Sequence, residues 1–516
     1  MVVLDTSLLW LSVLLPVIIS ILGVRSEKYE TLASIIAALL LFPLVIVAVA
    51  AIKGSLSSGI VDPAYTTING IGTLAFALDG LSALVVAGIS VVTAFVAFYS
   101  LPYMKTRIEE MRTEGEEPPS LGVYYLLYTL FAVAMVGLVY STNLILFYLF
   151  LELTLIPSFL LIAYYGYGDR KRIAMLYFVW THLGAVVFLA GALYYGYIAG
   201  NFDYLNIDTL SPVGNAASIL GNMTTLIAAL MTFGLFVKMA VLGVHMWLPY
   251  AHAEAPTPIS ALLSPNLIGL AGYAMARITV PLFPDFYTAN QWFFIYLAFA
   301  TIIYGGLVAL KQTDFKRFLA YSSVSQMGYM LLGIATLTSL GITGAMLHYL
   351  AHAVGKAVLF MTAGVFITDL HGFRDITRMG GLARKYPMTA ALALVGFMHL
   401  VGMPPTVGMW SEIFIILGLF RAIDISAQFI LITLLLIVAL GISASYAFIN
   451  MRRIFYGKPR SDTAERAKPE SVGILQWSML AIAFFGFLFF LWITPYYDSL
   501  LTAASKIVQI LQTVMG

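Results

Sequence analysis

The sequence contains no cysteine among its 516 residues and has few charged side chains. The missing thiols exclude disulfides, thiolate-bound iron–sulfur clusters, cysteine-containing zinc sites and cysteine nucleophiles. Charged residues make up only 10% of the chain and hydrophobic residues 61%, whereas soluble domains are about one quarter charged. The formal net charge of +2 offers no basic surface for nucleic acid. The composition therefore predicts a polytopic membrane protein, and any electrons must flow in other chains.

Apolar runs of about 20 residues, the length that a helix needs to cross a bilayer, recur along the whole chain. They predict an all-α fold with fourteen transmembrane helices, which cover residues 7–24, 31–52, 81–100, 122–140, 142–165, 173–199, 218–247, 256–280, 291–310, 318–336, 341–368, 387–420, 427–450 and 474–494. The first run has no basic leader and no small-residue cleavage site, so it is expected to be a span rather than a signal peptide.

Three segments outside these runs also have predicted structures. Residues 71–79 are expected to form a turn or short hairpin on the outer surface, and the charged stretch 105–120 a solvated cytoplasmic loop. The final stretch from Asp498 is amphipathic and predicts a short helix.

Lysine and arginine residues collect on every second loop, as the positive-inside rule requires when the spans are correctly assigned. The loops after spans 1, 3, 5, 9, 11 and 13 hold 21 of the 27 basic residues. The opposite side holds only Lys53, Arg277, Arg421 and Lys506. This asymmetry predicts a multi-pass protein of the plasma membrane with both termini outside.

Two runs contain helix-breaking residues at matching positions. Span 7 contains Gly243 and leads to Pro249, and span 12 is 34 residues long with Gly402, Pro404 and Pro405 at its middle. Proline removes a backbone donor and clashes with the preceding turn, so both helices are predicted to be broken. Because they lie five spans apart, spans 4–8 and 9–13 are expected to form two inverted five-helix repeats.

This repeat predicts four parts of the chain. They are an N-terminal part with spans 1–3 (1–121), the first repeat (122–280), the second repeat (291–450), and a final part with a cytoplasmic loop, span 14 and the amphipathic helix (451–516).

A few ionisable residues lie inside the predicted spans: Glu152, Lys238, Lys356 and Glu412, with His182, His245, His348, His352 and His399. Each charged one costs roughly 2.5–3.5 kcal/mol at a helix centre, so each must face water, a partner or another ionisable group. His348, His352 and Lys356 follow the spacing i, i+4, i+8, which places them on one helix stripe about 12 Å long. Histidine exchanges protons near neutral pH, and this line predicts a proton relay.

A structural explanation stands beside this one. The charged residues could form silent ion pairs, and His182 and His399 could each be packed histidines that donate to a helix carbonyl. His252 and Glu254 are expected at the cytoplasmic mouth between spans 7 and 8, and Lys316 at the cytoplasmic start of span 10. These three residues and His245 are candidates for accessory roles beside the proton relay.

Five segments carry these residues: FLELTLIPSFLLI (150–162), VKMAVLGVHMWLPYAHAEAPTP (237–258), KQTDFKRFLAYSSVSQMGYM (311–330), HYLAHAVGKAVLF (348–360) and GMPPTVGMWSE (402–412). Through them, residues 75–455 resemble the antiporter-like ion-pumping subunits shared by respiratory complex I, Mrp-type Na⁺/H⁺ antiporters and membrane-bound energy-converting hydrogenases. Glu412, the segment 373–387 and the lack of a long lateral helix after span 14 resemble the M-type subunit.

The resemblance implies a proton-transfer chain along the middle of the membrane. Glu152 would pair with Lys238, and Lys238 would pass a proton to the group formed by His348, His352 and Lys356. Glu412 would release the proton to the outside or receive it. The implied partners are other membrane subunits of a redox or Mrp-type complex, lipid, and protons or Na⁺, with no cofactor or metal in this chain.

Two positions depart from the family pattern. The family often carries a lysine or histidine on the eighth helix, where this chain has Gly269, and a proline after the broken-helix lysine, where it has Ala240. The lateral path would therefore need water or a different residue at the eighth helix.

Other functions remain open on the sequence. The chain could be an Mrp-type or stand-alone cation/H⁺ antiporter, a transporter of an organic solute, or a scaffold whose charges bind neighbours. The buried polar residues are nearly all titratable, which favours protons or Na⁺ over an organic solute. No nucleophile constellation, nucleotide loop or metal cluster is apparent, so redox chemistry in this chain is not expected.

Overall fold

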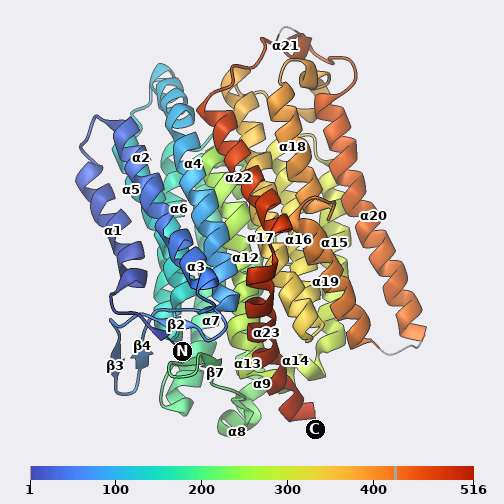
Figure 1. Cartoon of the computed structure of the whole chain (residues 1–516). Helices are drawn as coiled ribbons and strands as arrows, with labels where there is room; N and C mark the ends of the chain where they lie inside the picture. The colour runs from blue at the N-terminus through green and yellow to red at the C-terminus, as the bar shows by residue number, and fades with distance from the viewer. Residues whose placement is uncertain (1, 424–426, 466, 516) are drawn as a thin grey trace.

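The computed structural model describes residues 2–423, 427–465 and 467–515. Helices standing side by side form a single bundle, with short strands at one end (Figure 1). The first half contains α1 (Leu8–Gly23), α2 (Tyr29–Leu40), α3 (Phe42–Ile52), α4 (Gly80–Thr113), α5 (Leu121–Tyr140), α6 (Leu144–Tyr165), α7 (Arg170–Ala199), α8 (Ala217–Leu220), the 3₁₀ turn η1 (Gly221–Met223), α9 (Thr224–Met239), α10 (Trp247–Glu254), α11 (Thr257–Leu262), the π-helical turn η2 (Leu263–Leu267), α12 (Ile268–Ala274), the π-helical turn η3 (Met275–Thr279), α13 (Val280–Leu282) and α14 (Pro284–Ala289).

The second half repeats the pattern of long apolar helices. It contains α15 (Gln291–Lys311), α16 (Phe315–Ala335), α17 (Ser339–Asp369), the 3₁₀ turns η4 (Ile376–Arg378) and η5 (Leu382–Arg384), α18 (Pro387–Leu400), α19 (Val407–Ala422), α20 (Ala427–Phe455), α21 (Asp462–Glu465), α22 (Ile474–Leu491) and α23 (Thr494–Met515). In the described ranges, eleven helical stretches are long and apolar enough to cross a membrane. The polytopic membrane class that the composition predicted is confirmed at this level.

Polar side chains at the ends of the apolar runs fix where several helices begin. Asp79 and Ser82 form a reciprocal capping box at the start of α4. Asn143 accepts the Ile145 N–H at the start of α6, and Thr338 accepts the Gly341 N–H at the start of α17. These side chains satisfy backbone donors that a helix start leaves unpaired.

Short strands gather at the lower end of the bundle in Figure 1, beside the end of α23. β1 (Val2–Val3), β2 (Ile60–Val61) and β5 (Ala77–Leu78) form one small sheet, β3 (Thr66–Ile68) pairs with β4 (Gly72–Leu74), and β6 (Leu205–Asn206) pairs with β7 (Ser211–Pro212). The hairpin predicted for residues 71–79 is therefore partly right, because it spans residues 66–74 and β5 leads on to the start of α4.

Both predicted helix breaks are present. The seventh span ends earlier than predicted, since α9 stops at Met239 and Ala240 takes a left-handed conformation with a φ of 57°. The chain continues through Gly243, with a φ of 95°, to α10. The twelfth span is divided into α18 and α19 around Gly402, whose φ is 62°.

The solvated loop predicted for residues 105–120 is wrong over its first half, because α4 continues without interruption to Thr113. Charged side chains stabilise this extension. Lys105 forms an ion pair with Glu30 at 2.7 Å, and Arg107 donates to the Gly166 carbonyl at 2.7 Å. The amphipathic end of the chain does form a helix, α23, whose buried residues are mainly apolar: Leu500, Ala503, Ala504, Ile507 and Leu511.

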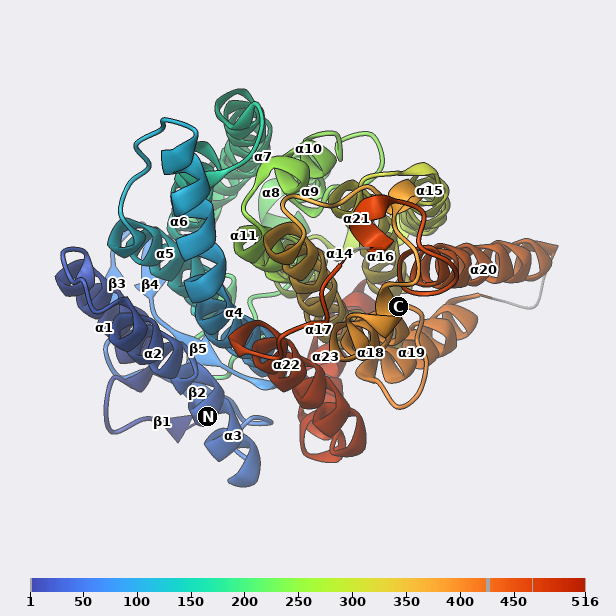
Figure 2. The same cartoon turned by 90° about the horizontal axis from the view of Figure 1, so that it is seen from above.

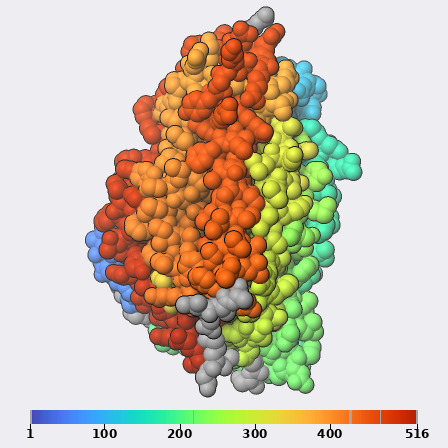
Figure 3. Space-filling model, turned by 90° about the vertical axis from the view of Figure 1, so that its right-hand side faces the viewer, coloured from blue at the N-terminus to red at the C-terminus, as the bar shows by residue number. Residues whose placement is uncertain are grey.

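Two spans occupy the centre of the bundle. The apolar windows of the continuous stretch 257–282 and of α17 are both 100% buried. Seen from above, α17 is surrounded by α4, α11, α16, α18, α22 and α23 (Figure 2). At the edge, α20 is only 28% buried and forms a column along one face (Figure 3). Residues in these two windows are therefore shielded from the surroundings of the bundle on all sides.

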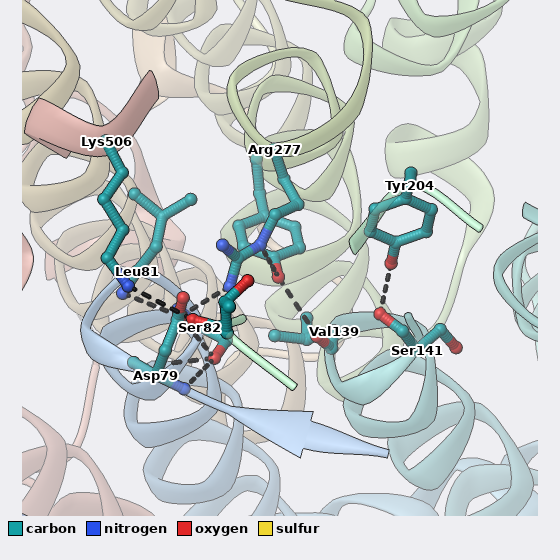
Figure 4. Close-up of polar contacts among 10 residues, drawn as sticks. Asp79, Leu81, Ser82, Val139, Ser141, Tyr204, Arg277 and Lys506 are labelled. Atoms are coloured by element: carbon teal, nitrogen blue, oxygen red, sulfur yellow. Dashed lines mark hydrogen bonds and ion pairs between the residues drawn. The ribbon is translucent and has the colours of Figure 1, made fainter. Parts of the chain in front are cut away.

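A buried ion pair joins the N-terminal part of the chain to the eighth span near the strand-bearing end. The Arg277 guanidinium of η3 donates to the Asp79 carboxylate at 2.5 Å and to the Tyr273 hydroxyl at 3.3 Å (Figure 4). Tyr273 in turn donates to the Val139 carbonyl at the end of α5. Burial alone would raise the pKa of Asp79, but Arg277 outweighs it, so this pKa lies below the usual value. The pair is therefore complete at neutral pH and is lost only as the pH falls through that lowered value.

Replacing Arg277 with methionine is expected to destabilise the chain by about 3–5 kcal/mol, because the Asp79 charge would remain buried without its partner. Thermal unfolding of the assembled complex in lipid nanodiscs measures the effect. Arg172→Met is the matched control, since that side chain is 83% exposed. Adding Asp79→Asn to Arg277→Met should recover part of the loss, and equal stability of the Arg277 and Arg172 variants would contradict the buried pair's role.

Candidate ion-translocation site

Lys238 lies in the last turn of α9, immediately before the break in the seventh span. Its side chain is buried and its ammonium group donates to the Thr154 hydroxyl of α6 at 3.4 Å. The broken segment is held in place by tertiary contacts, because the Trp247 indole donates to the Val237 carbonyl at 2.9 Å. A charged amine at this depth has no opposite charge within ion-pair distance in the described part of the chain. Its only hydrogen-bond partner among the described residues is thus a neutral hydroxyl.

Glu152 lies on α6, two residues before the threonine that Lys238 contacts. Its carboxylate contacts the His182 Nδ1 atom at 3.2 Å, and this histidine belongs to the neighbouring helix α7. The direct Glu152–Lys238 ion pair expected from the family resemblance is not formed in this structure. The two residues are linked through α6 instead, because Thr154, the hydrogen-bond partner of Lys238, lies on the same helix as Glu152.

His182 is a residue whose role the sequence left undecided between relay and packing. The structure excludes a bond from its Nδ1 atom to a helix carbonyl, because that atom faces the Glu152 carboxylate and the ring stacks on Phe178 at 5.4 Å. The only indication of this contact in the sequence was that His182 is an ionisable residue inside the apolar run 173–199. Its side chain is 44% exposed, so the pair lies at the outer face of α6 and α7.

The histidine and lysine stripe of α17 is completely buried. His348 Nδ1 lies 3.3 Å from the Ser411 hydroxyl of α19, and Lys356 donates to the Leu319 carbonyl of α16 at 2.8 Å and to the Ser322 hydroxyl. Both ring nitrogens of His352, between these two residues, have no hydrogen-bond partner among the described residues. Buried polar atoms are almost always paired with protein or water, so this stripe calls for water around His352.

Glu412 lies on α19, in the second turn after the break in the twelfth span. Its carboxylate packs against Gly402, where an added Cβ would collide with the carboxylate oxygen. Nearby, the Gln326 amide of α16 donates to the Leu400 carbonyl at the end of α18, at 3.0 Å. The break thus brings a carboxylate close to the end of α18, where Gln326 caps the last carbonyl.

The accessory residues divide into two groups. Lys316 donates to the Ala253 and Ala255 carbonyls at the end of α10, and its ammonium group lies 5.8 Å from the Tyr167 ring. The Tyr167 N–H donates to the Glu254 carbonyl, so the Lys316 side chain and the Glu254 backbone both lie next to Tyr167. His252 stacks on Phe360 of α17 at 5.0 Å.

Two further histidines stand apart from this group. His245 lies in the break of the seventh span, with its ring centre 5.1 Å from that of Tyr304. His399 Nδ1 lies 2.9 Å from the Val395 carbonyl, the packed arrangement that the sequence allowed as an alternative. Its own helix therefore accounts for His399 Nδ1, whereas the buried Nε2 atom has no hydrogen-bond partner among the described residues.

The described residues contain no group of three or more histidine, aspartate or glutamate side chains that could hold a metal ion. What they contain instead is a set of buried groups that can each gain or lose a proton, placed at two helix breaks and along the central helix between them. Helix breaks with buried ionisable groups define a class of polytopic membrane proteins that bind and move ions.

Comparison with known proteins identifies the particular family. A family model described as NADH:quinone oxidoreductase/Mrp antiporter, transmembrane region, matches residues 141–442. NADH-quinone oxidoreductase subunit M of Rickettsia prowazekii is 32% identical over 369 residues, which cover 70% of each chain. F(420)H(2) dehydrogenase subunit M of Methanosarcina mazei is 32% identical over 408 residues, covering 77% of this chain and 79% of the relative. The chain belongs to the NADH:quinone oxidoreductase/Mrp antiporter family.

The fold agrees with this assignment. A chain of respiratory complex I from Thermus thermophilus superposes with a TM-score of 0.81 at 25% identity, over 98% of this chain and 99% of that one. The protein is therefore an antiporter-like subunit of the kind found in complex I and related membrane complexes.

Proposed function

We propose that this chain moves protons, or Na⁺ in their place, across the membrane as an antiporter-like subunit of a redox-driven complex. The observation that carries the proposal is the α17 stripe, in which His348, His352 and Lys356 are fully buried and both ring nitrogens of His352 lack a protein partner. Water at these atoms would join the stripe into a path for protons. Lys238 and Glu412 lie at the two helix breaks and would be the ends of that path.

Glu152 and His182 give the path a means of control. The negative charge of Glu152 favours the protonated form of Lys238. Protonation of His182 would turn its contact with Glu152 into an ion pair and would weaken the attraction between Glu152 and Lys238. Lys238 would then give up its proton toward α17, and Glu412 would pass it on at the far end. Lys316, His252 and Glu254 would guide protons in from the cytoplasmic side, with His245 accessory at the break.

The topology that suits this mechanism has fourteen spans with two inverted five-helix repeats, 122–280 and 291–450. Residues 1–121 and 451–516 would flank them. The broken helices, five spans apart, and the placement of β1 and the end of α23 at the end opposite α21 support this arrangement (Figure 1). Both termini would lie outside the plasma membrane.

We further propose that the chain works with other membrane subunits and holds no cofactor of its own. The two relatives are named as subunits of NADH-quinone oxidoreductase and of F(420)H(2) dehydrogenase, and both names describe redox enzymes. The part-exposed Glu152–His182 pair supports a protein neighbour at that face, since lipid is a poor environment for it. Membership of an Mrp-type antiporter is the second candidate, because the family includes such proteins.

The test uses the assembled complex reconstituted into liposomes that contain a pH-sensitive dye. Glu152→Gln is expected to lower the initial rate of proton movement at least about tenfold, or about 1.4 kcal/mol on the barrier, because it removes the charge that tunes Lys238. Glu114→Gln, at an exposed position, is the matched control. A Na⁺-sensitive dye in parallel liposomes identifies the ion.

The outcomes separate the candidates. Unchanged movement of both ions in the Glu152 variant would overturn the assigned role and favour a scaffold. Ion exchange without any electron donor would favour the Mrp-type candidate, and uptake of an organic solute by the chain would favour a secondary transporter.

A further inference from the structure

The eighth span crosses the centre of the bundle without the lysine or histidine that would join the two halves of the path. Gly269 stands at that position, and an added Cβ would lie 2.5 Å from the ring of Tyr349 on α17. No larger residue fits at 269 unless that aromatic ring moves. A polar group that joins Lys238 to His352 must therefore lie elsewhere on this span.

Asn266 is such a group, three residues earlier. Its side chain is fully buried, and neither its amide oxygen nor its amide nitrogen has a hydrogen-bond partner among the described residues. A carboxamide can make as many as four hydrogen bonds, and leaving each buried polar group unpaired costs about 1–3 kcal/mol. A buried carboxamide without a protein partner is suited to bind water.

The backbone around Asn266 also departs from a regular α-helix. It lies in the π-helical turn η2, where the Ile268 N–H bonds to the Leu263 carbonyl, and π-helical turns occur frequently at functional sites. Pro265 has no N–H, so one carbonyl in the preceding turn loses its usual donor. The Ser264 hydroxyl bonds to the Ser323 hydroxyl of α16 at 2.6 Å. This turn is the polar segment of a span whose apolar window is fully buried.

The position of the turn connects the two groups of ionisable residues. η2 packs against α17, the helix that carries His352, and α12, which follows it, packs against α9, the helix that carries Lys238. Both ring nitrogens of His352, like those of His252, have no hydrogen-bond partner among the described residues. Unpartnered polar atoms therefore lie on both sides of the contact between the eighth and eleventh spans.

We propose that Asn266 is a positioning residue that binds water between Lys238 and His352 and so completes the lateral proton path. This inference rests on the proposed function. The amide carries no proton at any step. A proton arriving from Lys238 joins the water, a proton leaves the same water chain for His352, and the amide orients the water as donor and acceptor. At this position the eighth span thus passes protons through a neutral side chain.

The test compares variants in the reconstituted complex and measures proton movement in H₂O and in D₂O. Asn266→Leu, of similar size, is expected to lower the initial rate about tenfold or more. The reason is that leucine cannot hydrogen-bond to the water, and one buried hydrogen-bonding group is worth about 1–3 kcal/mol. Asn266→Ser, which keeps a hydroxyl, should restore at least one third of the normal rate. Asn450→Leu is the matched control, since Asn450 is equally buried but lies on α20 at the edge of the bundle. In Asn266→Ser the D₂O effect should exceed that of the unaltered chain, because water transfer becomes limiting.

Two results would overturn the inference. In one, Asn266→Leu moves protons at the normal rate per assembled complex while Lys238→Ala does not, which leaves the proposed function intact. In the other, Asn266→Leu and Asn266→Ser are equally slow with an unchanged isotope effect, which assigns Asn266 to packing alone. Normal rates in both the Lys238 and the Asn266 variants would instead contradict the proposed function itself.

Discussion

Lys238→Ala is expected to lower ion movement by the reconstituted complex at least about a hundredfold, equal to about 2.7 kcal/mol on the barrier. Lys238 is the buried amine at the break of the seventh span, with Thr154 as its hydrogen-bond partner. Without it, the group that accepts a proton beside Glu152 is missing. Initial rates from a pH-sensitive dye inside liposomes, divided by the amount of assembled complex, measure the effect.

A second substitution at the same position separates charge from proton release. Lys238→Arg keeps the positive charge, but a guanidinium stays protonated in proteins, so this variant should also lose ion movement. Lys311→Ala, at an exposed position, is the control and should leave the rate unchanged. If Lys238→Arg moved ions normally, the lysine would serve only as a fixed charge and the relay assignment would fail.

Lys356→Met is expected to abolish ion movement while leaving the free energy of unfolding unchanged or higher. The ammonium group of Lys356 is fully buried and bonds to neutral partners, the Leu319 carbonyl and the Ser322 hydroxyl. A buried charge without an opposite charge is costly, and methionine fills a similar volume without that cost. In the variant the Leu319 carbonyl would still accept a hydrogen bond, because the Ser323 hydroxyl also donates to it.

The separate responses of ion movement and of stability make this variant informative. A residue kept for stability would lower both quantities when replaced, whereas a residue kept for proton transfer lowers only ion movement. Thermal unfolding in nanodiscs and the liposome assay are run on the same preparation. Lys458→Met, at an exposed position, is the control. A destabilised Lys356→Met variant that still moves ions would place Lys356 among the structural residues.

The sequence predicted the features of the fold that arise from composition and local backbone chemistry. The membrane class followed from the apolar runs, and the two broken helices followed from Gly243 and from Gly402 with its adjacent prolines. The stripe on α17 followed from helical spacing alone, because its three residues lie on one uninterrupted helix. Each of these depends on residues close together in the chain.

The features that escaped prediction depend on contacts between distant segments. Alanine favours helices, yet Ala240 ends α9 in a left-handed conformation, and the Trp247–Val237 and Leu242–Thr301 hydrogen bonds support that geometry. The pairing of Glu152 with His182 instead of Lys238 depends on which helices α6 touches. A single sequence does not contain that information.

The close packing of Gly402 against Glu412 constrains what evolution can change. Position 402 needs glycine twice over, once for its φ of 62° and once because a Cβ would collide with the carboxylate. Any larger residue at 402 would displace the Glu412 carboxylate from its present place. The glycine ten residues before the glutamate therefore decides where the carboxylate of the twelfth span can lie.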